Sequence, residues 1–221
     1  MSQAASGTPR RGFLGGIAAG AAALVVGRWS KASAEIAPLA PPPLGDEWLS
    51  RIKGKHRQVF DATSANDGFG VGFALTFLDT TKEALKLTDA DLTAVVVLRH
   101  FSMPLTLNDK MWAKYKIGEL LNVKDPKTNA FATRNIFRDN IPLHPNLTYE
   151  QVIATRGVII CACNMALVVV SGMAAPKAGV TADVAKKDWT ANLLPGVVLV
   201  PSGVYAVNRA QETACTYCYA G

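Results

Sequence analysis

The sequence predicts an α/β protein in which about five strands form one mostly parallel sheet with helices on both faces. Strand-type and helical patterns alternate from residue 56 to residue 219, and this alternation is typical of parallel strands joined by right-handed crossovers. The segments 92–98 and 158–160 are almost wholly apolar, as expected of strands buried on both faces. With 49% hydrophobic and 18% charged residues, the chain has the composition of one globular domain and is neither disordered nor a coiled coil.

The first 34 residues predict an export signal. Thr8-Pro-Arg-Arg-Gly-Phe-Leu14 precedes a Gly/Ala-rich apolar segment over 15–27 and an A-x-A cleavage pattern, Lys31-Ala-Ser-Ala34. This arrangement resembles a twin-arginine (Tat) signal peptide. The apolar segment is shorter than the ~20 residues that span a bilayer, and no later stretch is long enough. We therefore expect a periplasmic protein that starts at Glu35 and has no stable membrane span after cleavage. An uncleaved signal would instead leave it anchored.

A Pro-rich spacer and the first half of the domain follow the signal. Residues 35–50 contain four prolines and are expected to be extended, so the domain is predicted over 51–221. A β-type pattern predicts the first strand, and a β-branched apolar pattern predicts the second. A polar capping residue ahead of apolar periodicity predicts each helix. These elements are the strands 56–62 and 92–98 and the helices 67–85, capped by Asp67, and 108–121, capped by Asn108.

Residues 122–147 contain turn signals and no clear period, which indicates an excursion from the domain. A capping-box pattern at Thr148-Tyr-Glu-Gln151 then opens a short helix that ends at Gly157. Alternation resumes after this helix, and Ser202 is a predicted cap. The remaining predicted elements are the strands 158–163, 197–201 and 215–219 and the helices 164–173, 181–194 and 202–213.

The basic character of the chain lies in its predicted signal. The whole sequence has a net charge of +6. Four of the 23 Lys and Arg residues fall in the first 34 residues, which contain no Asp or Glu, and the rest of the chain balances 19 basic against 17 acidic side chains. No basic cluster able to follow a phosphate backbone remains, so nucleic-acid binding is not expected.

Ligands of open parallel sheets bind beyond the carboxyl ends of the strands. This rule selects candidate residues from the predicted strand ends. His100 could act there as an acid, base or ligand, or could be an ordinary surface histidine. The dipeptide Ser202-Gly203 could hold an anion or simply cap a helix. The full set is Asn66, Asp67, Arg99, His100, Cys161, Cys163, Ser202, Gly203 and Cys218.

Two cysteines mark the end of the strand 158–163. Cys161 and Cys163 are two residues apart and are therefore expected on the same face of the strand. Cys163 adjoins the start of the next helix, where free N–H groups and the macrodipole favour a thiolate. We predict Cys163 as the reactive thiol, and the alternative is an inert buried cysteine.

Cys215 and Cys218 form a C-x-x-C pattern, which brings the number of thiols to four. Four cysteines, Cys161, Cys163, Cys215 and Cys218, could hold zinc or an iron–sulfur cluster, although their spacing is not that of a zinc ribbon. In an oxidising compartment they could instead form structural disulfides. Metal ligands, disulfides and free thiols thus remain open, and the sequence requires no cofactor.

From Val158 onward the chain resembles the DsrE/DsrF-like family of sulfur-relay proteins. Two segments carry the resemblance, Gly157-Val-Ile-Ile-Cys-Ala-Cys-Asn-Met-Ala-Leu167 and Leu193-Leu-Pro-Gly-Val-Val-Leu-Val-Pro-Ser-Gly-Val-Tyr-Ala-Val-Asn-Arg-Ala-Gln-Glu212. The resemblance implies a flavodoxin-like domain that forms trimers or hexamers. It also implies that a strand-end cysteine carries sulfur as a persulfide between partner proteins. Cys163 matches that cysteine best, and Cys161 is the second choice.

These observations predict an exported sulfur-handling protein. Cys163 would accept sulfur, and Cys161 would resolve it as a disulfide or take the transfer. Two alternatives use the same residues: a metal-binding or redox accessory protein with the four-cysteine site, and a non-catalytic binding module with structural disulfides.

Overall fold

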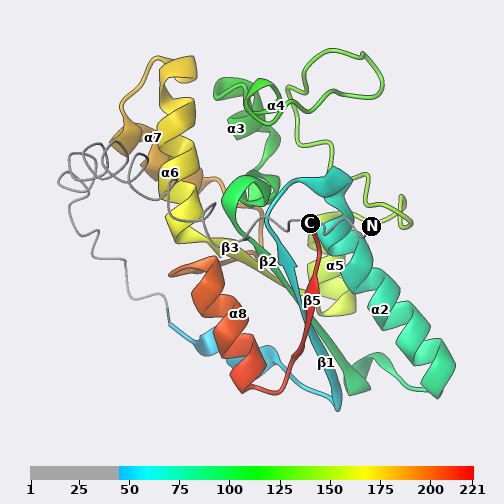
Figure 1. Ribbon diagram of the computed structural model, residues 1–221. Coiled ribbons are helices and arrows are strands. Elements are labelled where there is room, and N and C mark those ends of the chain that lie inside the picture. Colours follow the sequence, from blue (N-terminus) through cyan, green and yellow to red (C-terminus); the bar gives the residue numbers. More distant parts are fainter. Residues whose placement is uncertain (1–44) are drawn as a thin grey trace, which may run out of the picture. The chain divides into compact units, whose positions relative to one another are not determined.

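The computed structural model describes residues 45–221, so the predicted signal peptide and most of the predicted spacer lie outside the described residues (Figure 1). Five strands form one sheet in the order β4-β3-β2-β1-β5, and every neighbouring pair is parallel. This confirms the predicted α/β class. The strands are β1 (His56–Ala62), β2 (Leu92–Leu98), β3 (Ile159–Cys163), β4 (Val198–Val200) and β5 (Thr216–Tyr219).

The strand order explains how the helices are shared between the two faces of the sheet. From β1 to β4 the chain always steps in one direction, and right-handed crossovers keep those helices on one face. The chain then returns to the free side of β1, so α8 (Gly203–Glu212) crosses the opposite face, away from α2 (Phe69–Leu85), as Figure 1 shows. The other α-helices are α3 (Asp109–Lys114), α4 (Ile117–Leu120), α5 (Tyr149–Arg156), α6 (Asn164–Ala174) and α7 (Ala182–Ala191).

Two apolar clusters cover the two faces. Side chains of β2 alternate between them, with Val96 in the larger cluster and Val95 and Val97 in the smaller one beneath α8. The smaller cluster also contains Trp48, which is 3% exposed and belongs to a 3-10 helix, η1 (Glu47–Arg51). Residues 47–50 therefore pack with the folded domain, ahead of the start at residue 51 that the sequence predicts. An indole ring that seals an apolar face needs no regular pattern in the sequence around it.

Two predicted helix details are wrong. Asp67 does not cap a helix, because it lies with a φ of 49° inside the 3-10 turn η2 (Asn66–Gly68), and the left-handed Gly68 precedes α2. The helix expected over 108–121 is broken into α3 and α4 at Lys116, which has a φ of 49°. Close packing follows the break, since a Cβ on Gly118 would lie 2.3 Å from the carbonyl oxygen of Ala132.

Other predicted helix ends are confirmed. Asn108 caps α3 by accepting a hydrogen bond from the N–H of Met111, and Ser202 caps α8 in the same way. The capping box at Thr148 and the left-handed Gly157 bound α5. Short 3-10 helices supply the remaining turns, η3 (Asp89–Asp91), η4 (His100–Thr106) and η5 (Ala175–Ala178).

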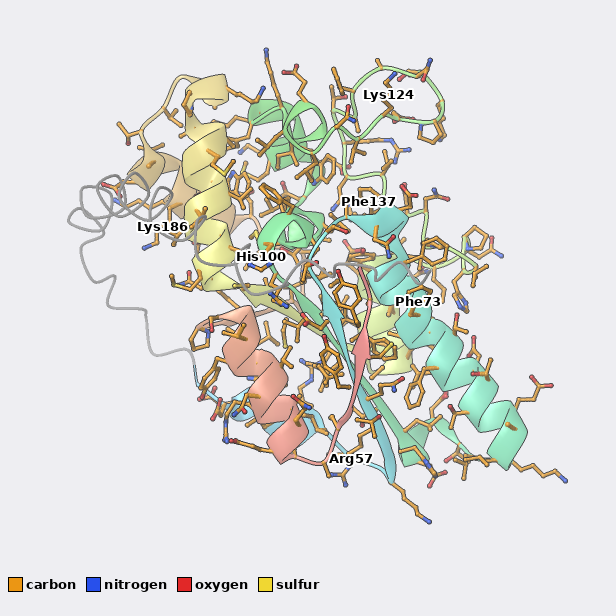
Figure 2. All side chains as sticks on the ribbon, viewed as in Figure 1. Arg57, Phe73, His100, Lys124, Phe137 and Lys186 are labelled. Carbon is orange, nitrogen blue, oxygen red and sulfur yellow. The ribbon has the colours of Figure 1, made fainter. Side chains whose placement is uncertain are left out.

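The excursion over 122–147 has no helix or strand beyond isolated bridges, yet it is anchored to the domain. Asn135 is 1% exposed, and its side-chain amide donates to the carbonyl oxygens of Leu105 and Leu107. Figure 2 shows Phe137 beside the start of α2, whereas Lys124 lies on the outlying loop. Because Phe137 belongs to the larger cluster, this segment completes the domain core.

Within residues 45–221, no single helix is long and apolar enough to cross a membrane. One pair of helical segments, Asn164–Ala178 and Ala182–Ala191, meets the length and composition criteria together but is bent by 112°.

Candidate functional site

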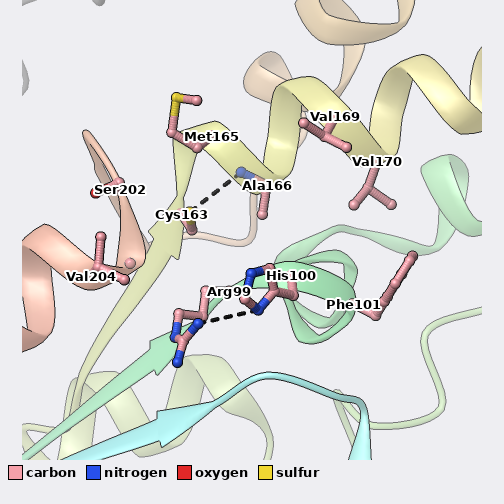
Figure 3. Close-up of a pocket in the computed structure, with 11 residues that line it drawn as sticks. Arg99, His100, Phe101, Cys163, Met165, Ala166, Val169, Val170, Ser202 and Val204 are labelled. Carbon is pink, nitrogen blue, oxygen red and sulfur yellow. Dashed lines mark hydrogen bonds between the residues drawn. The ribbon is translucent and has the colours of Figure 1, made fainter. Parts of the chain in front are cut away.

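A pocket opens at the carboxyl edge of the sheet, beyond the ends of β2, β3 and β4. The chain leaves β3 into α6 on one face and leaves β4 into α8 on the other, so the two connections diverge. Divergence of neighbouring connections is the feature that creates ligand crevices in open α/β sheets. The pocket has a volume of about 330 Å³ (Figure 3) and is lined by Arg99, His100, Phe101, Cys163, Met165, Ala166, Val169, Val170, Ser202, Gly203 and Val204.

Cys163 is the cysteine that faces this pocket. It ends β3 and is the N-cap of α6, where its Sγ accepts a hydrogen bond from the N–H of Ala166 at 3.3 Å (Figure 3). The residue is 5% exposed. Cys163 therefore lies at the end of a strand, at the start of a helix and on the lining of the pocket, as its position in the sequence predicts.

Arg99 brings a positive charge to the same pocket. Leu98 of β2 pairs with Ala162 of β3, so Arg99 and Cys163 are the next residues along their two strands. The guanidinium donates to both carboxylate oxygens of Asp61, from Nε at 2.6 Å and from Nη2 at 2.9 Å. The hydrogen bonds that Arg99 donates to Asp61 raise the pKa of Arg99, and the charges of Asp61, Tyr217 and Cys163 contribute in the same direction.

His100 lies beside Arg99 on the pocket lining (Figure 3). Its backbone φ of 50° lies in the left-handed region, which turns the chain out of β2 immediately after Arg99. Arg99 Nη1 lies 3.2 Å from Nδ1 of His100. A guanidinium has donors but no acceptor, so Nδ1 accepts this hydrogen bond and the ring proton is on Nε2.

The rest of the lining is mostly apolar. Four of these side chains are also largely open to solvent, since Phe101 is 46%, Met165 51%, Val169 56% and Val204 66% exposed. Apolar walls with a few convergent polar groups are typical of small-molecule pockets. A ligand here would meet the thiol, the guanidinium and the imidazole at one end of an apolar surface.

Cys161 does not reach this pocket. It is fully buried in the smaller cluster beneath α8, and burial raises the pKa of its thiol to about 12. The predicted second thiol of a relay pair is therefore not available beside Cys163. The sequence predicts that Cys161 and Cys163 lie on the same face of the strand, but they belong to different apolar clusters. The reason is that the chain turns into α6 at Cys163, whose side chain contacts the larger cluster.

The structure does not assemble the four-cysteine site. Cys215 belongs to the smaller cluster, whereas Cys218 packs against the larger one on the other face, as expected for residues three apart in an extended strand. β5 is also separated from β3 by two strands. Among residues 45–221 no group of three or more His, Cys, Asp or Glu side chains could hold a metal, and all four cysteines are free thiols. The described structure therefore does not bring the four predicted metal ligands together.

Two other residues selected from strand ends make structural contacts. Asn66 Nδ2 donates to the carbonyl oxygen of Ala220, and Ser202 Oγ accepts from the N–H of Tyr205 as a helix cap. Neither Asn66, Asp67 nor Cys218 lines the pocket. Sequence reasoning missed Asp61, and its one available signal was an acidic residue inside an otherwise apolar part of β1.

Comparisons with known proteins add little to this description. No family model matches the chain, and no curated protein matches it. Among solved structures it is similar to a protein of unknown function from Methanobacterium thermoautotrophicum, with 17% identity over 74% of this chain and 98% of that one, at a TM-score of 0.34. A likeness of this size carries no argument about function, so the site rests on its own geometry.

Proposed function

We propose that this protein handles sulfane sulfur, with Cys163 as the residue that accepts and carries it. One observation carries the proposal: of the four cysteines, Cys163 alone lines the pocket, where it caps a helix beside a guanidinium. The resemblance of the segments 157–167 and 193–212 to sulfur-relay proteins supports the same assignment.

The chemistry is a thiol–persulfide exchange. The Cys163 thiolate attacks the outer sulfur of a donor R–S–SH, and a bond forms between Sγ and that sulfur. The bond between the two donor sulfurs breaks, and R–S⁻ leaves with the electron pair. The product is a persulfide on Cys163. Sulfur changes carrier without an external oxidant or reductant, in the same way that thiol–disulfide exchange passes through a mixed intermediate.

The pocket lining supplies what this exchange needs. Arg99 stabilises negative charge on the attacking sulfur and on the leaving thiolate, and the Nε2–H of His100 is available as a donor to the leaving group. The buried apolar side chains of the lining, Ala166 and Val170, limit the access of water to the persulfide, which is otherwise lost to side reactions. Cys161 takes no part in this scheme because it does not line the pocket.

Location and assembly complete the proposal. The twin-arginine pattern within residues 1–34 favours export to the periplasm, and the family resemblance favours a homotrimer or homohexamer that exchanges sulfur with a donor or acceptor protein. The exposed apolar side chains around the pocket mouth, Phe101, Met165 and Val204, suit a docked partner that covers Cys163 during transfer.

The first experiment is intact-mass analysis of the full chain after incubation with glutathione persulfide. We expect one added sulfur atom, removed by a reducing agent and located at Cys163 by peptide mapping. Cys163→Ser should abolish the addition, whereas Cys218→Ser, the matched change of a partly exposed thiol outside the pocket, should retain it. Loading at Cys218 or at no cysteine would contradict the proposal. A bound apolar small molecule with no covalent change would favour a non-catalytic binding module instead.

A further inference from the structure

Asp61 is the most unusual charged residue in the described part of the chain. It is 4% exposed, and Asp125 is the only other charged residue among residues 45–221 that is buried. It lies on β1, two strands away from β3, and does not line the pocket. Three donors converge on its carboxylate, namely Arg99 Nε, Arg99 Nη2 and the hydroxyl of Tyr217, the last at 3.0 Å.

Building on the proposed role of Cys163, we propose that Asp61 is the positioning residue of this site. It holds the guanidinium of Arg99 beside Cys163 and, through Arg99, the imidazole of His100. Two hydrogen bonds from one planar guanidinium to one carboxylate fix the orientation of the group as well as its position. Tyr217 fixes the carboxylate in turn.

Gly203 holds Arg99 from the opposite side. A Cβ at this position would lie 2.6 Å from both Cβ and Cδ of Arg99, so the first residue of α8 packs directly on the stem of the arginine. The guanidinium is therefore fixed by Asp61 at its charged end and by the backbone of α8 along its stem. Its remaining nitrogen, Nη1, contacts Nδ1 of His100 on the pocket lining.

The charged groups around the Cys163 thiol are few. From the β2 side the pocket lining supplies Arg99 and His100, while neither α6 nor α8 places a titratable side chain on that lining. Asp61 and Tyr217 lie behind Arg99. The field at the thiol thus depends mainly on where the guanidinium is held.

This arrangement makes a prediction whose sign separates positioning from simple charge. If Asp61 acted on the thiol only through its own negative charge, Asp61→Asn would favour the thiolate. If Asp61 acts by holding Arg99, the same change releases the guanidinium and disfavours the thiolate. A nearby opposite charge shifts the midpoint of an ionisation by roughly one pH unit or more. The two explanations therefore predict measurable shifts of the thiol midpoint in opposite directions.

The experiment measures the alkylation rate of Cys163 by iodoacetamide from about pH 5 to about pH 10, with each cysteine resolved by peptide mapping. In Asp61→Asn we expect the midpoint of the rate profile to rise by roughly one pH unit, equal to about tenfold slower alkylation below the midpoint. Arg99→Gln should raise it similarly. The double variant should show no further rise, because both changes remove the same contact. A midpoint that falls or stays unchanged in Asp61→Asn would overturn the proposal.

Gly203→Ala provides a variant that changes no charge and improves helix propensity. Its Cβ must displace Arg99, so the midpoint should again rise while the domain remains folded. The matched control is Asp79→Asn, which breaks an ion pair with Arg156 of similar length, 2.6 Å, outside the pocket, and should leave the midpoint unchanged. The alkylation experiment needs no sulfur donor, so it is independent of the sulfur-loading experiment. If loading failed while the alkylation midpoints shifted as expected, the proposed function would be rejected and the positioning role of Asp61 retained.

Discussion

Two thiols two residues apart on β3 occupy very different surroundings. Cys161 lies in the sheet interior, fully buried among valines and isoleucine beneath α8. Cys163 lies at the carboxyl edge, where it caps α6 and faces a pocket shared with Arg99 and His100. The two thiols therefore differ in burial, in contact with a helix N-terminus and in access to the pocket. The difference comes from where the strand ends, because only the last residue meets a helix N-terminus and a crevice.

The largest expected difference concerns accessibility. Iodoacetamide should modify Cys163 in the native protein, whereas Cys161 should react only when the domain opens. Since opening of a buried strand costs several kcal/mol, we expect the two rates to differ by at least about 10³-fold. Peptide mapping of a time course without denaturant measures both. The comparison would break if Cys161 reacted at a rate within about tenfold of that of Cys163.

The next expected difference appears in alkaline solution. Burial raises the pKa of Cys161 from 9.0 to about 12, so the folded state holds this proton more tightly than the unfolded chain. The contribution of the protonated Cys161 thiol to the free energy of unfolding is fully present below about pH 9. It is lost as the pH rises toward 12, by roughly 1.4 kcal/mol per pH unit. Urea unfolding at several pH values should show that the difference in free energy of unfolding between the wild type and Cys161→Ala shrinks over this pH range. Val97→Ala, which opens a cavity beside Cys161 without removing a thiol, should show a constant difference.

The smallest expected difference concerns the free energy of unfolding, which the same Cys→Ser change should alter unequally at the two sites. Cys161→Ser places a hydroxyl in an apolar cluster and should lower the free energy of unfolding by about 1–3 kcal/mol. Cys163→Ser replaces the sulfur with an oxygen, a preferred N-cap acceptor, and should change stability by less than about 0.5 kcal/mol. Denaturant midpoints of the two variants measure this contrast. Equal losses at both positions would show that Cys163 is an ordinary core residue.

Most of the architecture could be predicted from the sequence. The strands at 56–62 and 92–98 match the observed bounds of β1 and β2. For 92–98 the reason is that a continuous apolar segment between turn signals has few alternatives in a parallel sheet. The rule of carboxyl strand ends located Arg99, His100 and Cys163 in one pocket. Helix caps formed by a single side chain, as at Asn108 and Thr148, were also predictable because the contact is local.

What failed depends on contacts between distant segments. The break at Lys116 accompanies a close approach between Gly118 and Ala132, and the burial of Trp48 depends on a sheet face formed much later in the chain. The four-cysteine site failed because counting thiols ignores which face of which strand each occupies. Asp61 was overlooked because its partners, Arg99 and Tyr217, are 38 and 156 residues away.

The return of the chain to β1 has a consequence for the order of folding. The strands β1 to β4 add to one another in sequence, so the walls of the pocket can assemble as these neighbours form. β5 must find a partner that lies 158 residues earlier, as the contact between Gln58 and Thr216 records, and contacts of such separation form slowly. Tyr217 arrives with that last strand. The pocket lining can therefore form before Tyr217 donates its hydrogen bond to Asp61. The alkylation rate of Cys163 during refolding would then report when β5 joins the sheet.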